Sequence, residues 1–129
     1  MQIGTASRLS GVSAKMIRHY ESIGLVPPPA RRDSNYRDYG DDDVHRLSFV
    51  RRARDLGFSI DEIRDLLRLW ADESRASADV RALAEAHIAD LDRRIERLRE
   101  MRASLAKLVC ACEGDHRPHC PIIESLAGN

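Results

Sequence analysis

The sequence predicts a mainly α-helical fold, with an N-terminal head of short helices and one long C-terminal helix. Hydrophobic residues make up 43% of the 129 residues, charged residues 33% and aromatic residues 5%. That profile suits helices with one apolar stripe better than a sheet-rich fold. Gly and Pro interrupt residues 1–57 repeatedly, whereas neither occurs at positions 78–109. The break in composition indicates a head followed by an uninterrupted helix.

Residues 1–25 are expected to form two short helices around a tight turn. The first runs roughly over Gly4–Leu9, and the second, capped by Ser13, runs over Ala14–Ile23 until Gly24 closes it. This is the spacing of a helix-turn-helix. The expected shared core is Ile3, Ala6, Leu9, Val12 and Ile17. The expected exposed side of the second helix is Ser13, Lys15, Arg18 and His19.

Residues 26–39 are expected to form a basic hairpin. The run Pro27-Pro28-Pro29 excludes a helix, and Asp33-Ser34-Asn35 reads as a turn between two extended pieces. Arg31 and Arg32 precede this turn. The segment Tyr36-Arg37-Asp38-Tyr39 follows it. A basic hairpin directly after a helix-turn-helix is typical of a DNA-binding wing.

Two more helices complete the head. The third is expected to start at an Asp41 or Asp42 cap and to end at Gly57. Its predicted apolar stripe is Val44, Leu47, Phe49, Val50 and Leu56. The segment Ser59-Ile60-Asp61-Glu62 is a capping box that opens the fourth helix. The predicted apolar side of that helix is Ile60, Ile63, Leu66, Leu67 and Trp70.

A polar loop at residues 72–78 leads to a helix from about Ala78 to Val109, roughly 45 Å long at 1.5 Å per residue. Its apolar residues alternate at spacings of four and three, with Arg102 as the interruption: Ala84, Ile88, Leu91, Ile95, Leu98, Leu105 and Val109. This seam indicates a coiled-coil pair, either antiparallel or parallel. No second long helix is predicted, so a homodimer is expected.

Three cysteines, Cys110, Cys112 and Cys120, fall within eleven residues. No signal peptide or membrane-spanning run is recognisable, so a cytoplasmic protein with reduced thiols and no membrane partner is expected. Under those conditions the cysteines read as metal ligands or reactive thiols rather than as a disulfide framework. Pro121 fits the first position of a short terminal helix, which places Cys120 at its N-cap.

Net charge is zero, but its distribution is uneven. Residues 1–58 carry ten Arg and Lys against seven Asp and Glu, and residues 59–129 carry eleven against fourteen. The weak positive balance of the N-terminal half is compatible with nucleic-acid binding there. The domains expected from these patterns are a head at 1–71, a linker and dimerisation helix at 72–109, and a metal-binding loop with a short helix at 110–129.

Several motifs resemble the MerR family of transcriptional regulators across essentially the whole chain. They are Ile17-Arg18-His19-Tyr20-Glu21, Gly24-Leu25-Val26, Asn35-Tyr36-Arg37-Asp38-Tyr39 and Arg54-Asp55-Leu56-Gly57-Phe58-Ser59. The segment from Cys112 through Cys120-Pro121-Ile122-Ile123-Glu124, with Ser77-Ala78-Asp79-Val80 upstream, resembles its copper-efflux (CueR/HmrR-like) branch.

This resemblance implies a winged-helix head, an antiparallel dimer through the long helix, and double-stranded promoter DNA as the partner. It also implies activation by kinking and untwisting an overlong promoter, so that RNA polymerase is reached indirectly through the DNA. Such regulation is indirect readout, in which the protein supplies the energy that deforms the DNA.

The candidate DNA contacts lie on the second helix and the hairpin: Lys15, Arg18, His19, Tyr20, Arg31, Tyr36, Arg37 and Tyr39. Guanidinium groups pair with phosphate through two nitrogens, and tyrosine hydroxyls donate to it. Two alternatives stay open from the sequence. Arg18 can be a solvated helix charge, and Tyr20 or Tyr39 can be a core aromatic. Asp33 and Asp38 would repel phosphate, so they are expected to point away or to hold arginines in place.

The candidate metal ligands are Cys112 and Cys120. Cu(I) is a soft ion that accepts two thiolates, and Ag(I) and Au(I) share this preference. A helix N-terminus at Cys120 favours the thiolate, which is the ligating form. Zinc is a rival because Cys110, His116 and His119 lie nearby, but their crowding differs from the separated ligand pairs of zinc folds. Loop histidines such as His116 and His119 are more often solvated than bound to a metal. Cys110 is expected to be a bystander, and His87 is expected to be structural.

Ser77 is the candidate selectivity residue. The resemblance implies that divalent-metal sensors of this family carry a further cysteine there, contributed by the other subunit. Serine supplies no thiolate charge, so a monovalent ion is expected. The alternative functions are a MerR-like regulator that responds to a divalent metal or to redox change through its cysteines, and an enzyme. No nucleophile set, phosphate-binding Gly loop or carboxylate pair is recognisable, so an enzyme is not expected.

Overall fold

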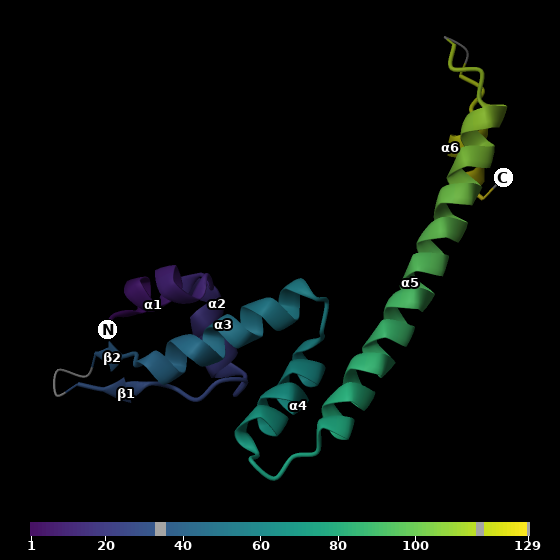
Figure 1. Cartoon of the computed structure of the whole chain (residues 1–129). Helices are drawn as coiled ribbons and strands as arrows, with labels where there is room; N and C mark the ends of the chain where they lie inside the picture. The colour runs from purple at the N-terminus through teal and green to yellow at the C-terminus, as the bar shows by residue number, and fades with distance from the viewer. Residues whose placement is uncertain (33–35, 116–117, 129) are drawn as a thin grey trace. The chain divides into compact units, whose positions relative to one another are not determined.

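The structure, a computed structural model, describes residues 1–32, 36–115 and 118–128 (Figure 1). Its elements are α1 (Ile3–Ser10), α2 (Ala14–Ser22), β1 (Ala30–Arg31), β2 (Arg37–Asp38), α3 (Asp41–Asp55), α4 (Ile60–Ala71), α5 (Ser77–Ala111) and α6 (Pro121–Leu126). The mainly helical fold with a long C-terminal helix is therefore confirmed. The chain divides into two compact units, residues 1–83 and 84–129. The domain boundaries expected after residues 71 and 109 stay predictions.

The helix-turn-helix forms through local capping. Gly11 ends α1 in the left-handed conformation, at a φ of 76°, and its N–H donates to the Ser7 carbonyl. The Ser10 hydroxyl then accepts a hydrogen bond from the Val12 N–H at 3.2 Å. Ser13 accepts one from the Met16 N–H at 3.2 Å and caps α2 as predicted. Three consecutive caps thus fix the turn between the two helices.

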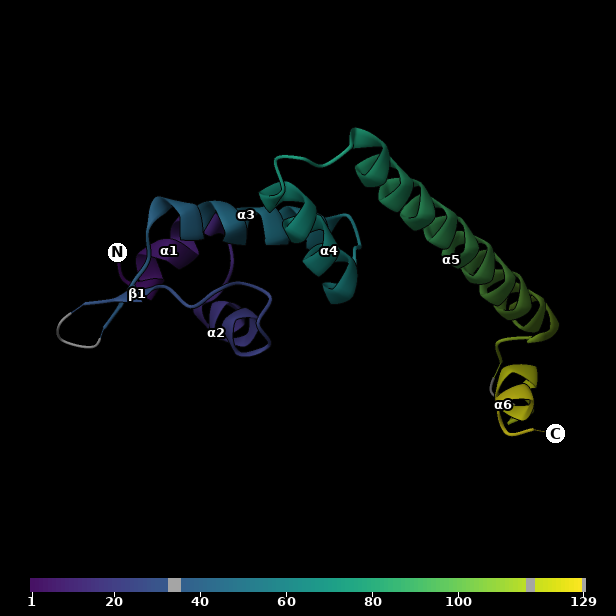
Figure 2. The same ribbon diagram turned by 90° about the horizontal axis from the view of Figure 1, so that it is seen from below.

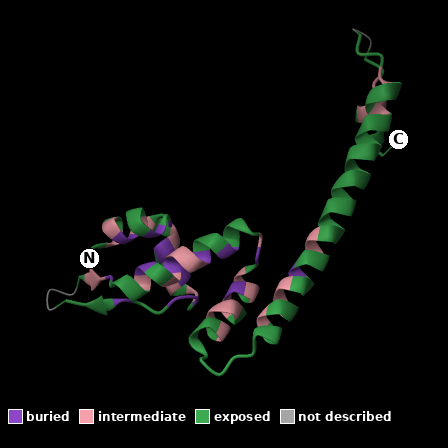
Figure 3. Cartoon of the chain, in the orientation of Figure 1, coloured by how far each residue is buried: buried purple, intermediate pink, exposed green. Residues whose placement is uncertain are grey.

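The core of residues 1–83 gathers apolar side chains from every helix of the head, and Figure 3 shows its buried residues there. Ile17, Leu47, Val50 and Ile63 are its largest fully buried side chains. Leu9 was expected in this core, but it is 62% exposed. Ala6 and Ser10, one turn apart, form the buried face of α1 instead, which turns Leu9 outward.

The hairpin has the predicted antiparallel pairing. Ala30 lies opposite Asp38 and Arg31 opposite Arg37, and the Arg32 N–H donates to the Tyr36 carbonyl at 2.9 Å. Beyond β2, the Tyr39 N–H donates to the Met1 carbonyl at 2.8 Å, which ties the hairpin to the segment before α1. The predicted turn Asp33-Ser34-Asn35 lies outside the described residues. Figure 2 views the same head from below.

The caps of α3 and α4 follow different rules. Gly40, rather than Asp41 or Asp42, is the N-cap of α3, because the Asp43 carboxylate folds back to accept the Gly40 N–H at 2.8 Å. That leaves both other aspartates in the first turn, where the helix dipole stabilises them. Ser59 and Glu62 form the predicted reciprocal capping box of α4, at 3.1 and 2.9 Å.

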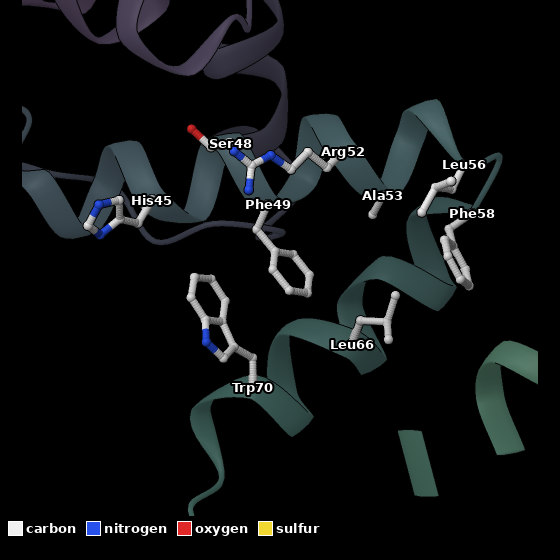
Figure 4. A pocket seen from close by; sticks show the side chains of 9 residues that line it. All are labelled: His45, Ser48, Phe49, Arg52, Ala53, Leu56, Phe58, Leu66 and Trp70. Carbon is white, nitrogen blue, oxygen red and sulfur yellow. The ribbon is translucent and has the colours of Figure 1, made fainter. Parts of the chain in front are cut away.

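An open pocket of about 450 Å³ lies between α3 and α4 (Figure 4). The Phe49 and Trp70 rings stack across it with centroids 4.6 Å apart. Leu56 was expected in the α3 stripe, but it is 65% exposed. It is the C-cap residue, so it lies just beyond the turn whose periodicity would have buried it.

In residues 84–129, α5 continues to Ala111 and α6 lies beside its last turns in both views (Figures 1 and 2). The seam residues are largely solvent-exposed: Ile88 and Ile95 are 56% and 46% exposed, Leu98 and Leu105 are 61% and 53%, and Val109 is 60%. Within the described ranges, no helix has both the length and the apolar character needed to cross a bilayer.

Candidate functional site

The exposed face of α2 carries Lys15, Arg18 and His19, as the sequence predicted. The Ser13 cap starts the helix, so these side chains are one and two turns from its N-terminus. Tyr20 differs, because its side chain is 6% exposed and belongs to the core. The predicted contact between Tyr20 and DNA stays a prediction. The core-aromatic alternative holds, since α2 turns Ile17 and Tyr20 inward together.

Side chains of α2 and of both strands meet at one hollow of about 440 Å³. Its lining residues are Gln2, Ile3, Arg18, Arg31, Tyr36 and Arg37. Tyr36 is 69% exposed, whereas the Arg37 side chain is 33% exposed. Three guanidinium groups around one opening form an arrangement suited to phosphate oxygens. The structure thus brings the predicted arginines of the helix and hairpin together.

Tyr39 lies behind the hairpin, not on its outer side. Its side chain is 2% exposed, and its hydroxyl donates a 2.7 Å hydrogen bond to Glu21 Oε1. Burial, and after it the hydrogen bond to the Glu21 carboxylate, raise the pKa of Tyr39 to about 12. The core-aromatic alternative fits Tyr39 too, because its hydroxyl donates to Glu21 inside the head, and a contact between Tyr39 and DNA stays a prediction.

Glu21 is a residue that the sequence reading missed. Its side chain is 5% exposed, and Glu21 Oε2 lies 3.0 Å from Arg37 Nη1. One buried carboxylate thus contacts Arg37 and Tyr39, two residues at the end of the hairpin. A sequence signal existed, since Glu21 sits near the C-terminal end of α2, where the helix dipole disfavours a negative charge. A nearby cation was therefore to be expected.

Asp38 holds an arginine in place, as anticipated. Its carboxylate accepts hydrogen bonds from the Met1 ammonium and, at 3.3 Å, from Arg32 Nη2. These two cations, the ammonium first, lower the pKa of Asp38 below its usual value. The carboxylate is thus occupied by cations within the head.

Arg64 on α4 is a second residue that the sequence reading missed. Its Nη1 and Nη2 donate to the carbonyls of Gly24 and Ile23, at 3.0 and 3.2 Å. These carbonyls lie just past the end of α2, where main-chain acceptors lack helical partners. No local pattern predicts this contact, because forty residues separate Arg64 from Gly24.

The two predicted metal ligands lie at facing element ends. Cys112 follows the last residue of α5, and its N–H donates to the carbonyls of Leu108 and Val109, both at 3.1 Å. Cys120 is the N-cap residue of α6. Both cysteines are half-buried, whereas Cys110 is exposed.

The groups around Cys120 lower the pKa of its thiol. The Ile123 N–H lowers the pKa of Cys120 most, and the Ile122 N–H and the Cys112 thiol add smaller effects in the same direction. The Cys120 side chain accepts no N-capping hydrogen bond, so the two N–H groups lower its pKa through their proximity to the sulfur. Desolvation and the Glu124 carboxylate oppose it. Two half-buried thiols, one biased toward thiolate, fit the needs of a soft ion with two ligands.

The surroundings of the thiols offer few other ligands. His119 Nδ1 lies 3.0 Å from Glu124 Oε1, and His116 lies outside the described residues. Among the residues described, no group of three or more His, Cys, Asp or Glu side chains is arranged to hold a metal. Ser77 is the exposed first residue of α5, and His87 is the buried residue of that helix.

Comparison with known proteins gives matches over nearly the whole chain. The model of the MerR HTH family regulatory proteins matches residues 1–70, and the model described as "MerR, DNA binding" matches residues 44–108. Heavy metal-dependent transcription regulator 2 of Rhizobium meliloti is 60% identical over 127 residues, which are 98% of this chain and 86% of that protein. The regulator CueR of Escherichia coli O157:H7 is 41% identical over 128 residues, which are 99% of this chain and 95% of that protein.

A solved structure agrees with these matches. The transcription regulator PbrR691 from Ralstonia metallidurans, in complex with lead(II), is 36% identical and covers 98% of each chain, with a TM-score of 0.84. The family model that matches the head and the relatives that match nearly the whole chain are transcription regulators, so this protein is a transcription regulator and not an enzyme. The chain therefore belongs to the MerR family of transcriptional regulators.

Proposed function

We propose that this protein is a cytoplasmic, metal-responsive activator that binds promoter DNA as a homodimer and switches on efflux or detoxification genes for a monovalent coinage metal. Cu(I) is the proposed effector, with Ag(I) and Au(I) as ions of the same class. The observation that carries the proposal is the placement of two half-buried cysteines, Cys112 directly after α5 and Cys120 at the N-cap of α6.

The DNA-binding part rests on the convergence of Arg18, Arg31 and Arg37 at one hollow. The proposed contacts are these arginines with Lys15, His19 and Tyr36, all of which have solvent-accessible side chains. Guanidinium groups hold phosphates in two-point contacts and so fix how a helix sits against the duplex. Tyr20 and Tyr39 are left out because both are buried.

The homodimer is proposed from the α5 seam. An exposed stripe of Ile, Leu and Val over this length is unusual for a helix that stays in water. Burying one such side chain contributes about 1.5–3 kcal/mol relative to full exposure. Five half-exposed seam residues per chain therefore supply enough driving force for a coiled-coil pair. The family resemblance favours the antiparallel arrangement.

The choice of a monovalent ion rests on ligand number and charge. Two thiolates satisfy Cu(I), whereas zinc takes four ligands. Ser77 supports this choice, because a serine at the start of α5 contributes no third thiolate from the second subunit. A divalent ion is the rival, since the similar PbrR691 structure contains lead(II). When bound, the metal would supply a crosslink between the two sulfurs that Cys112 and Cys120 hold in place.

Activation is proposed to act through DNA shape. Closing the loop between Cys112 and Cys120 would bias the dimer toward a conformation that kinks and untwists the promoter. RNA polymerase would then engage the promoter without a direct contact to the regulator. Metal is accordingly expected to change the conformation of the promoter more than the affinity for it.

The test is a competitive Cu(I) titration against a chelator, under reducing conditions, with Cys112→Ser, Cys120→Ser and, as matched control, Cys110→Ser. We expect the first two variants to lose more than about 100-fold in affinity, because each loses a ligand itself. Cys110→Ser should stay close to the unaltered protein. Unchanged affinity in Cys112→Ser and Cys120→Ser would refute the metal site. Tighter binding of Pb(II), Zn(II) or Hg(II) than of Cu(I) would establish the divalent rival.

A further inference from the structure

Glu21 occupies a position that is unfavourable on local grounds. It lies near the C-terminal end of α2, where the helix dipole places partial negative charge, and its side chain is 5% exposed. A carboxylate that loses its water is costly unless cations or hydrogen-bond donors replace that water. The stability of α2 alone gives no reason for an acid here, so the reason is to be sought in its partners.

Both partners belong to the hairpin rather than to the helix. Tyr39 donates to Glu21 Oε1 at 2.7 Å, and Arg37 Nη1 lies 3.0 Å from Oε2. The two partners sit on either side of Asp38 at the end of β2, so each oxygen of one carboxylate holds one of them. The hairpin strand is thereby attached to α2 at two points.

The attachment also orients Arg37. Its guanidinium carries five N–H donors in a rigid plane, and one edge of it is used on Glu21. The side chain remains 33% exposed and lines the hollow shared with Arg18 and Arg31. A second edge can therefore meet a phosphate while the first stays on the carboxylate.

We propose that Glu21 is a positioning residue for DNA recognition, because its carboxylate holds Arg37 and β2 at a fixed place relative to Arg18 on α2. This inference rests on the DNA-binding function proposed above. Glu21 contacts no DNA itself, since it is buried behind the arginines. It sets the spacing between the arginine of the helix and the arginine of the hairpin, and hence the pair of phosphates that they reach.

Positioning of Arg37 and net charge alone predict opposite changes in DNA affinity for a substitution of Glu21. Glu21→Gln keeps the size of the side chain and an oxygen that accepts from Tyr39, but it removes one negative charge. If only net charge mattered, this variant would bind polyanionic DNA more tightly. If Glu21 positions Arg37, the variant instead loses affinity for the specific site, while its affinity for arbitrary DNA stays equal or rises.

The experiment measures binding of the full-length protein to two duplexes. The specific probe, about 40 base pairs long to span two half-sites, is recovered by in vitro selection with the unaltered protein. A scrambled duplex of the same base composition is the second probe. Asp65→Asn is the matched control, because Asp65 is a 56% exposed carboxylate paired with Arg68 on α4. Thermal unfolding verifies that each variant is folded.

We expect Glu21→Gln to bind the selected duplex about tenfold more weakly, within the range of coupling between two residues in contact, with no loss on the scrambled duplex. Its slope of log affinity against log salt should be smaller in magnitude by about one, as for one lost phosphate contact. Asp65→Asn should change neither value. Equal or tighter binding of Glu21→Gln to the selected duplex, with an unchanged slope, would overturn the proposal.

A double-mutant cycle with Arg37→Met identifies the route of the effect. In the Arg37→Met background, Glu21→Gln should cause little further loss, because the group that it positions is gone. Fully additive losses would contradict positioning through Arg37. Failure of the unaltered protein to select any duplex would instead refute the DNA-binding function itself, so the two failures are distinguishable.

Discussion

Replacing Arg64 with Met tests whether α4 stabilises the end of α2. Arg64 donates to the carbonyls of Gly24 and Ile23, which follow the last turn of α2. Methionine preserves most of the aliphatic stem and removes the guanidinium. The variant therefore loses two hydrogen bonds and one cation at the negative end of the helix dipole, with little change in packing.

The expected cost is about 2 kcal/mol. A hydrogen bond from a charged donor contributes about 1.5–3 kcal/mol when buried, but Arg64 is half-buried, so water replaces part of each bond and about 0.5–1 kcal/mol apiece remains. The favourable placement near the helix C-terminus adds about 0.3–1 kcal/mol. Arg64→Lys, a point charge that reaches one carbonyl at a time, should recover roughly half of the loss.

The assay is urea unfolding at fixed protein concentration, since a dimer makes stability concentration-dependent. Arg68→Met is the matched control, because Arg68 is one turn further along α4 and is 72% exposed in its ion pair with Asp65. Such a pair contributes about 0–1 kcal/mol. Equal destabilisation by Arg64→Met and Arg68→Met, or a cost of Arg64→Met below about 0.5 kcal/mol, would refute the reasoning.

Three further predictions follow from single contacts. Tyr39 has a pKa of about 12 in the folded protein against an ordinary 10, so its contribution to stability is complete below pH 10 and is lost as pH rises toward 12. The difference in unfolding free energy between Tyr39→Phe and the unaltered protein should therefore narrow from pH 10 to pH 12. A difference that stays constant over this interval would contradict the prediction. Phe49→Leu removes the stacking partner of Trp70, the single tryptophan. This variant should lower the free energy of unfolding by about 1 kcal/mol beyond the effect of lost burial, and it should shift the tryptophan fluorescence maximum. Leu9→Ala, at an exposed position, should leave the fluorescence spectrum unchanged. Ser77→Cys should raise the affinity for Hg(II) relative to Cu(I) by at least about tenfold, whereas Ser104→Cys, further along α5, should not. If both variants change this affinity ratio equally in a competition titration, Ser77 does not determine metal selectivity.

The sequence predicted those features of the head that depend on neighbouring residues. The caps at Ser13 and Ser59, the tight turn between the first two helices and the proline-directed hairpin each arise within a few positions, where side-chain geometry leaves few choices. The start of α6 at Pro121 belongs to the same class. Periodicity was less reliable at helix ends. Leu9 and Leu56 fit an apolar stripe by spacing, but Leu9 lies off the buried face of α1 and Leu56 is the C-cap residue beyond α3.

Contacts between distant segments were not predictable from one sequence. The bonds from Arg64 to the end of α2 and from Glu21 to the hairpin depend on how helices cross, which spacing does not encode. The burial of two tyrosines was unpredictable for the same reason. Tyr20 and Tyr39 each carry a hydroxyl suited to phosphate, and only the packed head shows that both side chains point into the interior. A polar motif next to a binding helix identifies neighbours of the interface as readily as members of it.

The head exposes basic residues of α2 without carrying a large positive charge. Its excess of Arg and Lys over Asp and Glu is small, so charge counting alone gives a weak signal. The acids, however, are used internally. Asp41 and Asp42 lie in the first turn of α3, Asp43 folds back on Gly40, and Glu21 is buried behind the hairpin. Each placement satisfies the carboxylate at a helix end or with an arginine, which leaves Lys15 and Arg18 exposed on the opposite side of α2 from the core. Folding thus places several carboxylates at helix ends or on arginines, and it leaves two of the proposed DNA contacts exposed in a chain that is neutral overall.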